Sequence, residues 1–385
     1  MFQKNKVIDL YAGAGGLSLG AARAGFTLAA AVEIDKHANE THRRNFPATC
    51  HIDNDIATLS AADLLRQANI QDGELMGVIG GPPCQGFSSI GRRDPNDVRN
   101  KLFGHFMRIV AEAKPLFYLA ENVPGIQGDK NKGMLDEAFK HVADEYHCLD
   151  PIKVKASEYG APTSRTRLFF IGLRKDVCQD ADAARTLISA KPQVPVVKVS
   201  DALAGLPKQI RQAWQTEKQG VRAVEKLPDS FYASRMQGLI PEGVGDAEAI
   251  ARFNEKQLVN GNMGTVHAEE VRKRYAALSP GKRDPISKSA RLDANAFCPT
   301  LRAGTGSDKG SYQAVRPIHP TVGRVITPRE AARLQGFPDW FALHPTKWHS
   351  FRQIGNSVSP LVAEIVLAAI KTQIKAYRTT LENKG

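Results

Sequence analysis

The feature that most constrains the fold of this chain is the alternation of short apolar runs with helical patterns over its first 175 residues. Apolar runs typical of strands lie at residues 7–10, 28–32, 76–79, 116–120 and 168–173. Helical patterns lie between several of them, as at residues 17–24 and 102–113. Such alternation indicates an α/β domain with a mostly parallel sheet, and these folds bind ligands outside the carboxyl ends of their strands.

The pattern changes after about residue 191. The segment 191–208 contains three prolines, and residues 200–325 are rich in Gly, Lys and Arg with weak periodicity. Residues 360–377 have the spacing of an amphipathic helix, with Leu361, Ile365, Leu367 and Ile370 as its apolar positions. We therefore predict three parts: an α/β domain over 1–195, a smaller, basic and irregular domain over 196–340, and a return segment over 341–385 that completes the first domain.

Glycines crowd the turn after the first strand, in the sequence DLYAGAGG at residues 9–16. Glycine permits positive φ and lets a ligand approach the backbone, and the helix that follows presents free N–H groups. A glycine-rich first turn also suits a dinucleotide, but the spacing here is GxGG and not GxGxxG. The alternative is that these glycines merely form a turn.

Acidic residues follow the second strand, at 28–32, and a short third strand that precedes Asp55. Glu33 stands where a carboxylate can bind both ribose hydroxyls, and Asp55 stands where one can accept from an adenine amino group. Adenosine without a pyrophosphate fits this arrangement, so S-adenosylmethionine is the indicated ligand.

One cysteine, Cys84, follows the fourth strand in the sequence GGPPCQGFS at residues 80–88. The five cysteines are scattered and form no CxxC pair, which argues against a structural zinc site and a disulfide framework. A lone cysteine is usually a small buried hydrophobic residue. Cys84, however, lies in a polar turn stiffened by two prolines, so we interpret it as a reactive thiol. The polar loop that follows, residues 88–100, could close over a bound anion.

Further polar residues belong to the same edge of the sheet. Glu121 ends the fifth strand, which brings a carboxylate beside Cys84. Arg165 and Arg167 are two residues apart at the start of the next strand, so they point to one face. Both are permanent cations suited to anion or carbonyl recognition.

Six motifs in this order resemble those of the cytosine-5 DNA methyltransferases of prokaryotic modification systems. They are DLYAGAGG at 9–16, GGPPCQGFS at 80–88, ENV at 121–123, SRTR at 164–167, RLQGFP at 333–338 and QIGNSV at 353–358. The resemblance covers the whole chain except about 185–295. It implies a Rossmann-like S-adenosylmethionine-dependent catalytic domain over 1–195 and a target-recognition domain over 196–340. One position departs from the family pattern, because Thr163 stands where the family usually has Gln.

The resemblance implies a catalytic role for five residues: Cys84, Glu121, Asn122, Arg165 and Arg167. The Cys84 thiolate would add to carbon 6 of cytosine, which makes carbon 5 nucleophilic. Glu121 would hold the base at N3 and its amine, Arg165 would bind O2, and Asn122 would order the loop around Cys84. The base must leave the double helix for this chemistry.

The resemblance also implies a set of cofactor-binding residues at the sheet edge, with two more from the return segment. They are Tyr11, Gly13, Gly15, Leu17, Glu33, Ile34, Asp55, Ile56, Pro82, Asn356 and Val358. No metal is expected, because the sulfonium already carries an activated methyl group.

Double-stranded DNA is the implied substrate. The family carries a Thr-Leu pair in its recognition domain, and Thr300 and Leu301 match it. With these we expect DNA contacts from Arg92, Arg99, Arg302 and Thr305. The clusters at 272–274 and 282–283 could neutralise phosphates, or they could be a solvated helix face. The net charge of +12 agrees with a polyanionic partner, although many basic proteins bind no nucleic acid.

We expect a monomeric, cytoplasmic enzyme. No signal-peptide pattern follows Met1, and no apolar stretch approaches the roughly 20 residues needed to span a bilayer. A restriction endonuclease is an expected functional partner. Three alternatives stay open: a tRNA methyltransferase of the same superfamily, a non-catalytic DNA-binding homologue, and a Rossmann oxidoreductase. Phe87-Ser88 and the lack of a Cys-Phe-Thr sequence argue against the first, the presence of both Cys84 and Glu121 against the second, and the lack of a nicotinamide site against the third.

Overall fold

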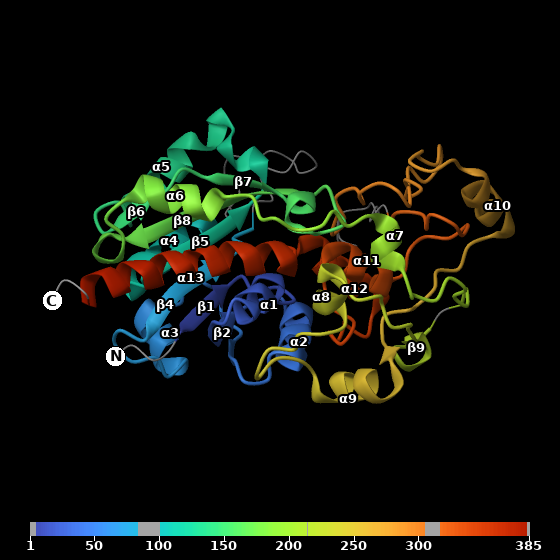
Figure 1. Ribbon diagram of the computed structural model, residues 1–385, viewed down its shortest axis with the longest axis horizontal. Coiled ribbons are helices and arrows are strands. Elements are labelled where there is room, and N and C mark those ends of the chain that lie inside the picture. Colours follow the sequence, from blue (N-terminus) through green and yellow to red (C-terminus); the bar gives the residue numbers. More distant parts are fainter. Residues whose placement is uncertain (1–4, 84–100, 214, 305–315, 383–385) are drawn as a thin grey trace.

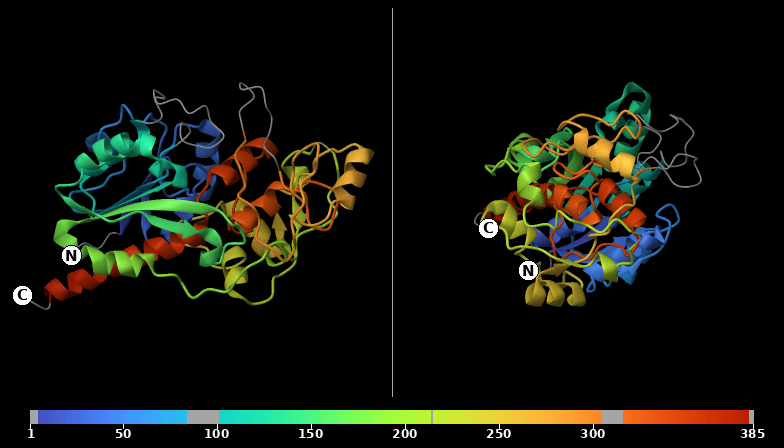
Figure 2. Two further views of the ribbon diagram at one scale, coloured as in Figure 1. Left: turned by 90° about the horizontal axis from the view of Figure 1, so that it is seen from above. Right: turned by 90° about the vertical axis from the view of Figure 1, so that its right-hand side faces the viewer.

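The structure is a computed structural model, and it describes residues 5–83, 101–213, 215–304 and 316–382 (Figure 1). The predicted site residues Cys84, Arg92, Arg99 and Thr305 lie outside the described residues. Figures 1 and 2 show an elongated molecule with the sheet in one half. The other half, formed mainly by residues between about 200 and 350, extends from one end of that sheet.

Eight strands form one sheet. Its order is β3 (Cys50–Ile52), β2 (Thr27–Val32), β1 (Lys6–Leu10), β4 (Leu75–Gly80), β5 (Phe117–Asn122), β8 (Thr166–Arg174) and β6 (Tyr146–Cys148), and β7 (Ile152–Lys155) also pairs with β8. Neighbours from β3 to β5 are parallel, β8 is antiparallel to β5, and both β6 and β7 are antiparallel to β8. The predicted α/β class with a mostly parallel sheet is therefore confirmed.

Helices cover both faces of the sheet. One face carries α1 (Gly16–Arg23), α6 (Ala181–Ser189) and α13 (Pro360–Glu382), and the other carries α3 (Ala61–Gln67), α4 (Leu102–Ala113) and α5 (Lys132–Lys140). Each face has its own cluster of buried apolar side chains. The sheet is thus the middle layer of three, and a ligand would be expected outside the carboxyl ends of its strands.

The central strands and α4 show why the sequence folds in this way. All six residues of β4 and all six of β5 are buried, as expected for parallel strands covered on both faces. In α4, four buried side chains follow the i, i+3, i+4, i+7 spacing of one helix face: Phe103, Phe106, Met107 and Val110. The predicted helix over 102–113 is confirmed.

The second half contains short helices joined by long irregular segments, in agreement with its weak periodicity. The helices are α7 (Val199–Leu203), α8 (Phe231–Met236), α9 (Ala247–Lys256), α10 (Glu269–Ala277), α11 (Pro328–Gln335) and α12 (Lys347–Asn356). One helix of the first half, α2 (Lys36–Asn45), contacts α12. Two-residue strands β9 (Arg222–Ala223) and β10 (Leu258–Val259) pair with each other. A single turn of 3-10 helix lies at Lys218–Gly220, and similar turns in the first half lie at Pro124–Gln127, Asp129–Asn131, Ala156–Tyr159 and Lys175–Val177.

The return helix α13 is longer than the 360–377 predicted from its periodicity. Leu361, Leu367 and Ile370 are fully buried, and Ile365 packs against the same core from a half-buried position. The stretch Lys347–Ala376 is apolar and long enough to cross a membrane by composition alone, but 78% of its most apolar window is buried inside the protein. One cluster of buried side chains includes residues from all three predicted parts. The division at 195 and 340 stays a prediction.

Candidate active site

The turn between β1 and α1 forms a backbone cradle at the carboxyl edge of the sheet. Gly13 and Gly15 have φ of 57° and 96°, which glycine adopts without strain. A Cβ atom at Gly15 would lie 2.3 Å from the Phe46 ring, and one at Gly16 would lie 2.3 Å from the Val358 carbonyl oxygen. A Cβ atom at Gly13 would meet nothing within 4 Å. The cradle is therefore closed on its inner side and open at Gly13.

The Glu33 carboxylate, just after β2, ties this cradle to the next turn. One oxygen accepts the Gly13 N–H and the other accepts the Asp35 N–H, each at 2.8 Å. Burial raises the pKa of Glu33, and the backbone donors act in the opposite direction. Beside it, the Ile34 side chain is 68% exposed. An oriented carboxylate next to an exposed apolar side chain suits a nucleoside, which offers ribose hydroxyls and a flat base.

The loop after β3 brings a second carboxylate to the same edge. Asp55 is exposed, and its Oδ1 accepts the Ala57 N–H at 2.9 Å. Arg108 of α4 holds the loop, because it donates to the carbonyl oxygens of Ile56 and Leu59 at 2.9 Å each. The ends of the three neighbouring strands β1, β2 and β3 thus bring Gly13, Glu33 and Asp55 to one edge of the sheet.

Three of the predicted cofactor residues are placed in ways that the sequence did not indicate. The Tyr11 hydroxyl donates to the Leu102 carbonyl oxygen at 2.9 Å, and burial raises its pKa. Leu17 is 5% exposed and belongs to the core under α1, so only its backbone can face a ligand. Val358 is also buried, whereas Asn356 is exposed.

The loop that leads to Cys84 starts beside the end of β5. β4 ends at Gly80, and Asn122 of β5 donates through Nδ2 to the Pro82 carbonyl oxygen at 3.2 Å. A Cβ atom at Gly81 would lie 3.4 Å from Oε2 of Glu121. The last described residues before Cys84 are therefore held against the two polar residues that end β5.

Glu121 and Arg167 form a close ion pair at this point. Glu121 is 8% exposed, and its Oε1 lies 2.6 Å from Nε of Arg167. The two residues come from adjacent antiparallel strands, β5 and β8. The structure therefore brings together a carboxylate and a guanidinium that the sequence separates by 46 positions.

Arg165 is 3% exposed, as deeply buried as Asn122 among the predicted catalytic residues that the structure describes. Its two terminal nitrogens donate to the carbonyl oxygens of Leu301 at 3.2 Å and Asn356 at 3.4 Å. Burial and the nearby Arg167 lower the pKa of Arg165 to about 9, and Glu121 acts in the opposite direction. The group stays charged at neutral pH, so a buried positive charge lies beside Glu121.

Thr163 replaces the usual Gln of the family. It links the segment that carries Arg165, just before β8, to the second half of the molecule. It pairs with Cys298 as an isolated parallel bridge, and its Oγ1 donates to the Cys298 carbonyl oxygen at 3.1 Å. The predicted DNA-contacting segment follows directly. Thr300 and Arg302 are exposed there, but the Leu301 side chain is buried. Only its neighbours can therefore offer side chains to a base edge.

A buried polar chain that the sequence motifs do not predict lies beneath the cradle. The Ser18 Oγ lies 2.5 Å from Oδ2 of Asp9 and 2.9 Å from Nε2 of His42, and Nδ1 of His42 lies 2.8 Å from Nε2 of His51. These residues lie on β1, α1, α2 and β3. No spacing rule connects them, although a charged residue in the apolar run VIDL was a signal that could have been noticed.

Comparison with known proteins identifies the family. The sequence matches the model for C-5 cytosine-specific DNA methylases over residues 5–372. The chain belongs to this family. It is therefore a DNA (cytosine-5-)-methyltransferase, as the motifs predicted.

Curated relatives match along most of their length. The type II methyltransferase M.XorII of Xanthomonas oryzae pv. oryzae is 41% identical over 368 residues, which cover 93% of this chain and 82% of the relative. The type II methyltransferase M.DdeI of Desulfomicrobium norvegicum is 31% identical, over 94% of this chain and 88% of the relative.

Solved structures share the fold. A candidate DNA modification methyltransferase encoded within an E. coli prophage is 48% identical, with a TM-score of 0.86, over 96% of this chain and 99% of the other. The S. pombe Dnmt2 methyltransferase is 18% identical with a TM-score of 0.59, over 96% of this chain and 98% of the other. At that identity, the second comparison supports the fold alone.

Proposed function

We propose that this enzyme transfers a methyl group from S-adenosylmethionine to carbon 5 of a cytosine within a specific double-stranded DNA sequence, by base flipping and a covalent adduct at Cys84. The observation that carries the proposal is the group formed by Glu121, Arg165 and Arg167 at the start of the Cys84 loop. A buried carboxylate beside guanidinium groups matches the N3, amine and O2 edge of a pyrimidine.

The chain's own residues have separate tasks in this reaction. The Cys84 thiolate attacks carbon 6 of the flipped base, while Glu121 holds N3 and promotes its protonation. Arg165 stabilises the charge that develops at O2, and Asn122 holds the loop through the Pro82 carbonyl oxygen. After methyl transfer, carbon 5 loses its proton and the Cys84 thiolate is eliminated.

The cradle fits the nucleoside part of the proposed cofactor. Gly13 leaves the turn open, Glu33 is fixed by two backbone N–H groups and would bind the ribose, and the exposed Ile34 offers an apolar surface to a base. Asp55, which is exposed after β3, would accept from the adenine amino group. The remaining predicted residues, Tyr11, Gly15, Leu17, Ile56, Pro82, Asn356 and Val358, would line the same site. When bound, the cofactor supplies an activated methyl group, so no metal is needed for the transfer.

Sequence specificity would come from the second half of the molecule. Thr300 and Arg302 are exposed on either side of Leu301, whose carbonyl oxygen accepts from Arg165. We expect Arg92, Arg99 and Thr305, which lie outside the described residues, to contact DNA as well. Because the named relatives are type II methyltransferases, we propose that the enzyme protects DNA against a restriction endonuclease, which would be a functional and not a physical partner. We propose that it acts as a monomer in the cytoplasm.

Substitution of the nucleophile tests the reaction directly. Cys84→Ser should bind the cofactor and DNA as the wild type does, but should lose nearly all methyl transfer, because a serine hydroxyl is a far weaker nucleophile. Incorporation of tritiated methyl groups into DNA and into tRNA measures the transfer and tests the substrate class. Bisulfite sequencing of a plasmid expressed with the enzyme identifies the target cytosine.

A covalent trap supplies the matching positive result. DNA with 5-fluorocytosine at the target should capture the wild type as an adduct at Cys84 alone, because fluorine blocks the final elimination. Peptide mapping of the adduct locates the attachment. Label in tRNA but not in DNA, or an adduct at another cysteine, would contradict the proposed function.

A further inference from the structure

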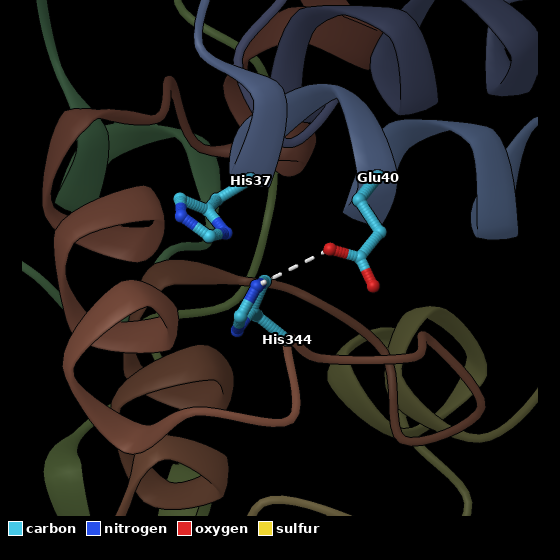
Figure 3. A group of neighbouring side chains, drawn as sticks. All are labelled: His37, Glu40 and His344. Carbon is cyan, nitrogen blue, oxygen red and sulfur yellow. Dashed lines mark ion pairs between the residues drawn. The ribbon is translucent and has the colours of Figure 1, made fainter.

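A second cluster of ionisable side chains lies where α2 meets the turn before α12 (Figure 3). His37 and Glu40 are three residues apart on α2, so they share one face of that helix. His344 faces them from the turn and is 5% exposed. One nitrogen or oxygen atom from each of the three lies within 4.8 Å of the other two, and among the described residues no second group of this kind is found.

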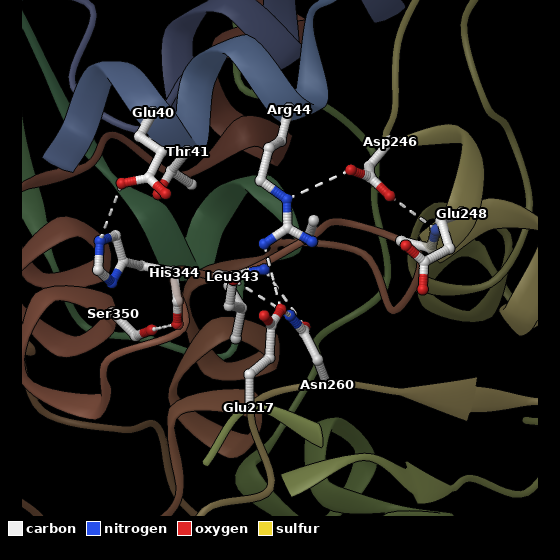
Figure 4. A network of polar contacts seen from close by, with 12 residues as sticks. Glu40, Thr41, Arg44, Glu217, Asp246, Glu248, Asn260, Leu343, His344 and Ser350 are labelled. Carbon is white, nitrogen blue, oxygen red and sulfur yellow. Dashed lines mark hydrogen bonds and ion pairs between the residues drawn. The ribbon is translucent and has the colours of Figure 1, made fainter. Parts of the chain in front are cut away.

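One nitrogen in this cluster is buried without a hydrogen bond. Nε2 of His344 has no hydrogen-bond partner, and the Glu40 oxygen that it faces lies 3.6 Å away. The ring is held from its other side, because Nδ1 accepts the Thr346 N–H at 2.9 Å. The His344 carbonyl oxygen accepts the Ser350 hydroxyl at 2.8 Å (Figure 4). A fixed, buried nitrogen that lacks a partner costs free energy and calls for an explanation.

Burial lowers the pKa of His344 and lowers that of the neighbouring His349 to about 4, which favours the neutral form of these two rings. The neutral imidazole is the form that binds metals. The His349 ring lies 3.7 Å from the His37 ring and 4.7 Å from the His344 ring, measured between centroids. The nearby Arg352 is paired with Asp35 at 2.9 Å. Glu40 is exposed and supplies a carboxylate that can move.

We propose that His37, Glu40 and His344 bind a divalent transition-metal ion of the zinc class. Two imidazoles and one carboxylate are a common zinc ligand set, and His349 or water would complete four-fold coordination. This site is separate from the proposed methyl transfer and does not depend on it. The ion would join α2, which follows Glu33, to the turn before α12, and would therefore be structural.

Ion binding requires a change at His344. Thr346 donates to Nδ1 of His344, so a neutral ring carries its proton on Nε2. When Nε2 binds an ion, the proton must move to Nδ1 and the Thr346 contact must open. This rearrangement makes the affinity lower than that of a preformed site, and binding should weaken at acidic pH, where the ligands are protonated.

Calorimetric titration of the full-length, tag-free protein with ZnCl2 tests the site. We expect one ion per chain at this site and a melting temperature that rises with zinc. His37→Gln and Glu40→Gln should each weaken binding by about tenfold or more, since even the outer-shell partners of metal ligands contribute that much. His141→Gln, which alters an exposed histidine on the other side of the sheet, should bind zinc as the wild type does.

Cobalt distinguishes this site from cysteine thiolates, which also bind zinc. Co2+ held by nitrogen and oxygen ligands gives visible d–d bands without a sulfur-to-cobalt charge-transfer band. A wild type that binds no zinc, variants that bind it as tightly as the wild type, or a one-to-one cobalt complex with a thiolate band would each overturn the proposal.

Discussion

At the scale of single residues, Asp9 is a carboxyl group beneath the glycine cradle whose environment disfavours its charged form. It is fully buried, and burial raises its pKa from 3.8 to about 7, while its contact with Ser18 acts in the opposite direction. The Ser18 hydroxyl donates to Oδ2 of Asp9, but Oδ1 is buried without a hydrogen bond among the described residues. Burial also lowers the pKa of His42 well below its usual value, so this ring offers no positive charge that would favour an ionised Asp9.

This arrangement predicts how stability depends on pH. Because the folded pKa lies above the unfolded value, the folded state holds more protons between about pH 4 and pH 7. Stability from Asp9 is fully present below that window and is lost as pH rises through it. Asp9→Asn should remove this slope and raise the free energy of unfolding at pH 8 by on the order of a few kcal/mol, at about 1.4 kcal/mol per pKa unit.

Urea denaturation of both proteins across pH 4–8 measures the effect. The difference between the two unfolding free energies should grow with pH, because only the wild type must ionise a buried carboxyl group. Parallel pH profiles for the wild type and Asp9→Asn would contradict the assignment.

At the scale of elements, α11 shows how a family motif can serve the fold. All eight residues of α11 are buried, including Arg329, Glu330 and Arg333. The helix starts with a capping box between Thr327 and Glu330, and it ends at Gly336 with φ of 95°. The capping residues and the glycine are local sequence signals that predict where the helix begins and ends. The sequence does not predict which residues pair with its buried charged side chains.

The buried pair of Arg333 and Asp339 gives the second stability prediction. Arg333 donates two hydrogen bonds of 2.7 Å to the Asp339 carboxylate, and both side chains are fully buried. Arg333→Met should cost about 3–5 kcal/mol of unfolding free energy, because it leaves a buried charge uncompensated. The double variant Arg333→Met with Asp339→Leu should recover much of that loss. A single variant as stable as the wild type in urea would contradict this account.

At the scale of the whole molecule, polar contacts join its two halves. Arg44 of α2 pairs with Glu217 at 3.1 Å and with Asp246, the N-cap residue of α9, at 3.2 Å (Figure 4). Asn260 donates to the same Glu217 carboxylate at 2.9 Å. Together with the shared apolar cluster, these contacts hold the second half against the end of the sheet.

The net charge of +12 agrees with a polyanionic partner, but the basic residues of the cluster at 272–274 do not all have the same environment. Arg274 pairs with the buried Asp284 at 2.6 Å and so has a structural role, whereas Lys273 is exposed. Lys273→Gln should weaken DNA binding equally for all sequences and reduce the slope of log K against log salt by about 1.

Fluorescence anisotropy over a salt series measures that slope. Lys140→Gln, which removes an exposed charge on α5 in the other half of the molecule, is the control and should keep the wild-type slope. Equal slopes for Lys273→Gln and the control would show that α10 does not contact phosphates.

The sequence by itself determined the features that depend on neighbours along the chain. Strand and helix periodicity predicted the sheet core and α4, and the glycine turn, the prolines before Cys84 and the ordered motifs identified the family. Each of these signals lies within a few residues, where spacing controls backbone conformation and side-chain direction.

Only the tertiary structure decided which distant groups meet. It paired Glu121 with Arg167, directed Arg165 to the Leu301 carbonyl oxygen, and buried the side chain of Leu301. It also assembled the His37, Glu40 and His344 cluster from segments about 300 residues apart. Burial and proximity set these contacts and the pKa of Asp9, and both depend on how the layers pack, which no local spacing specifies.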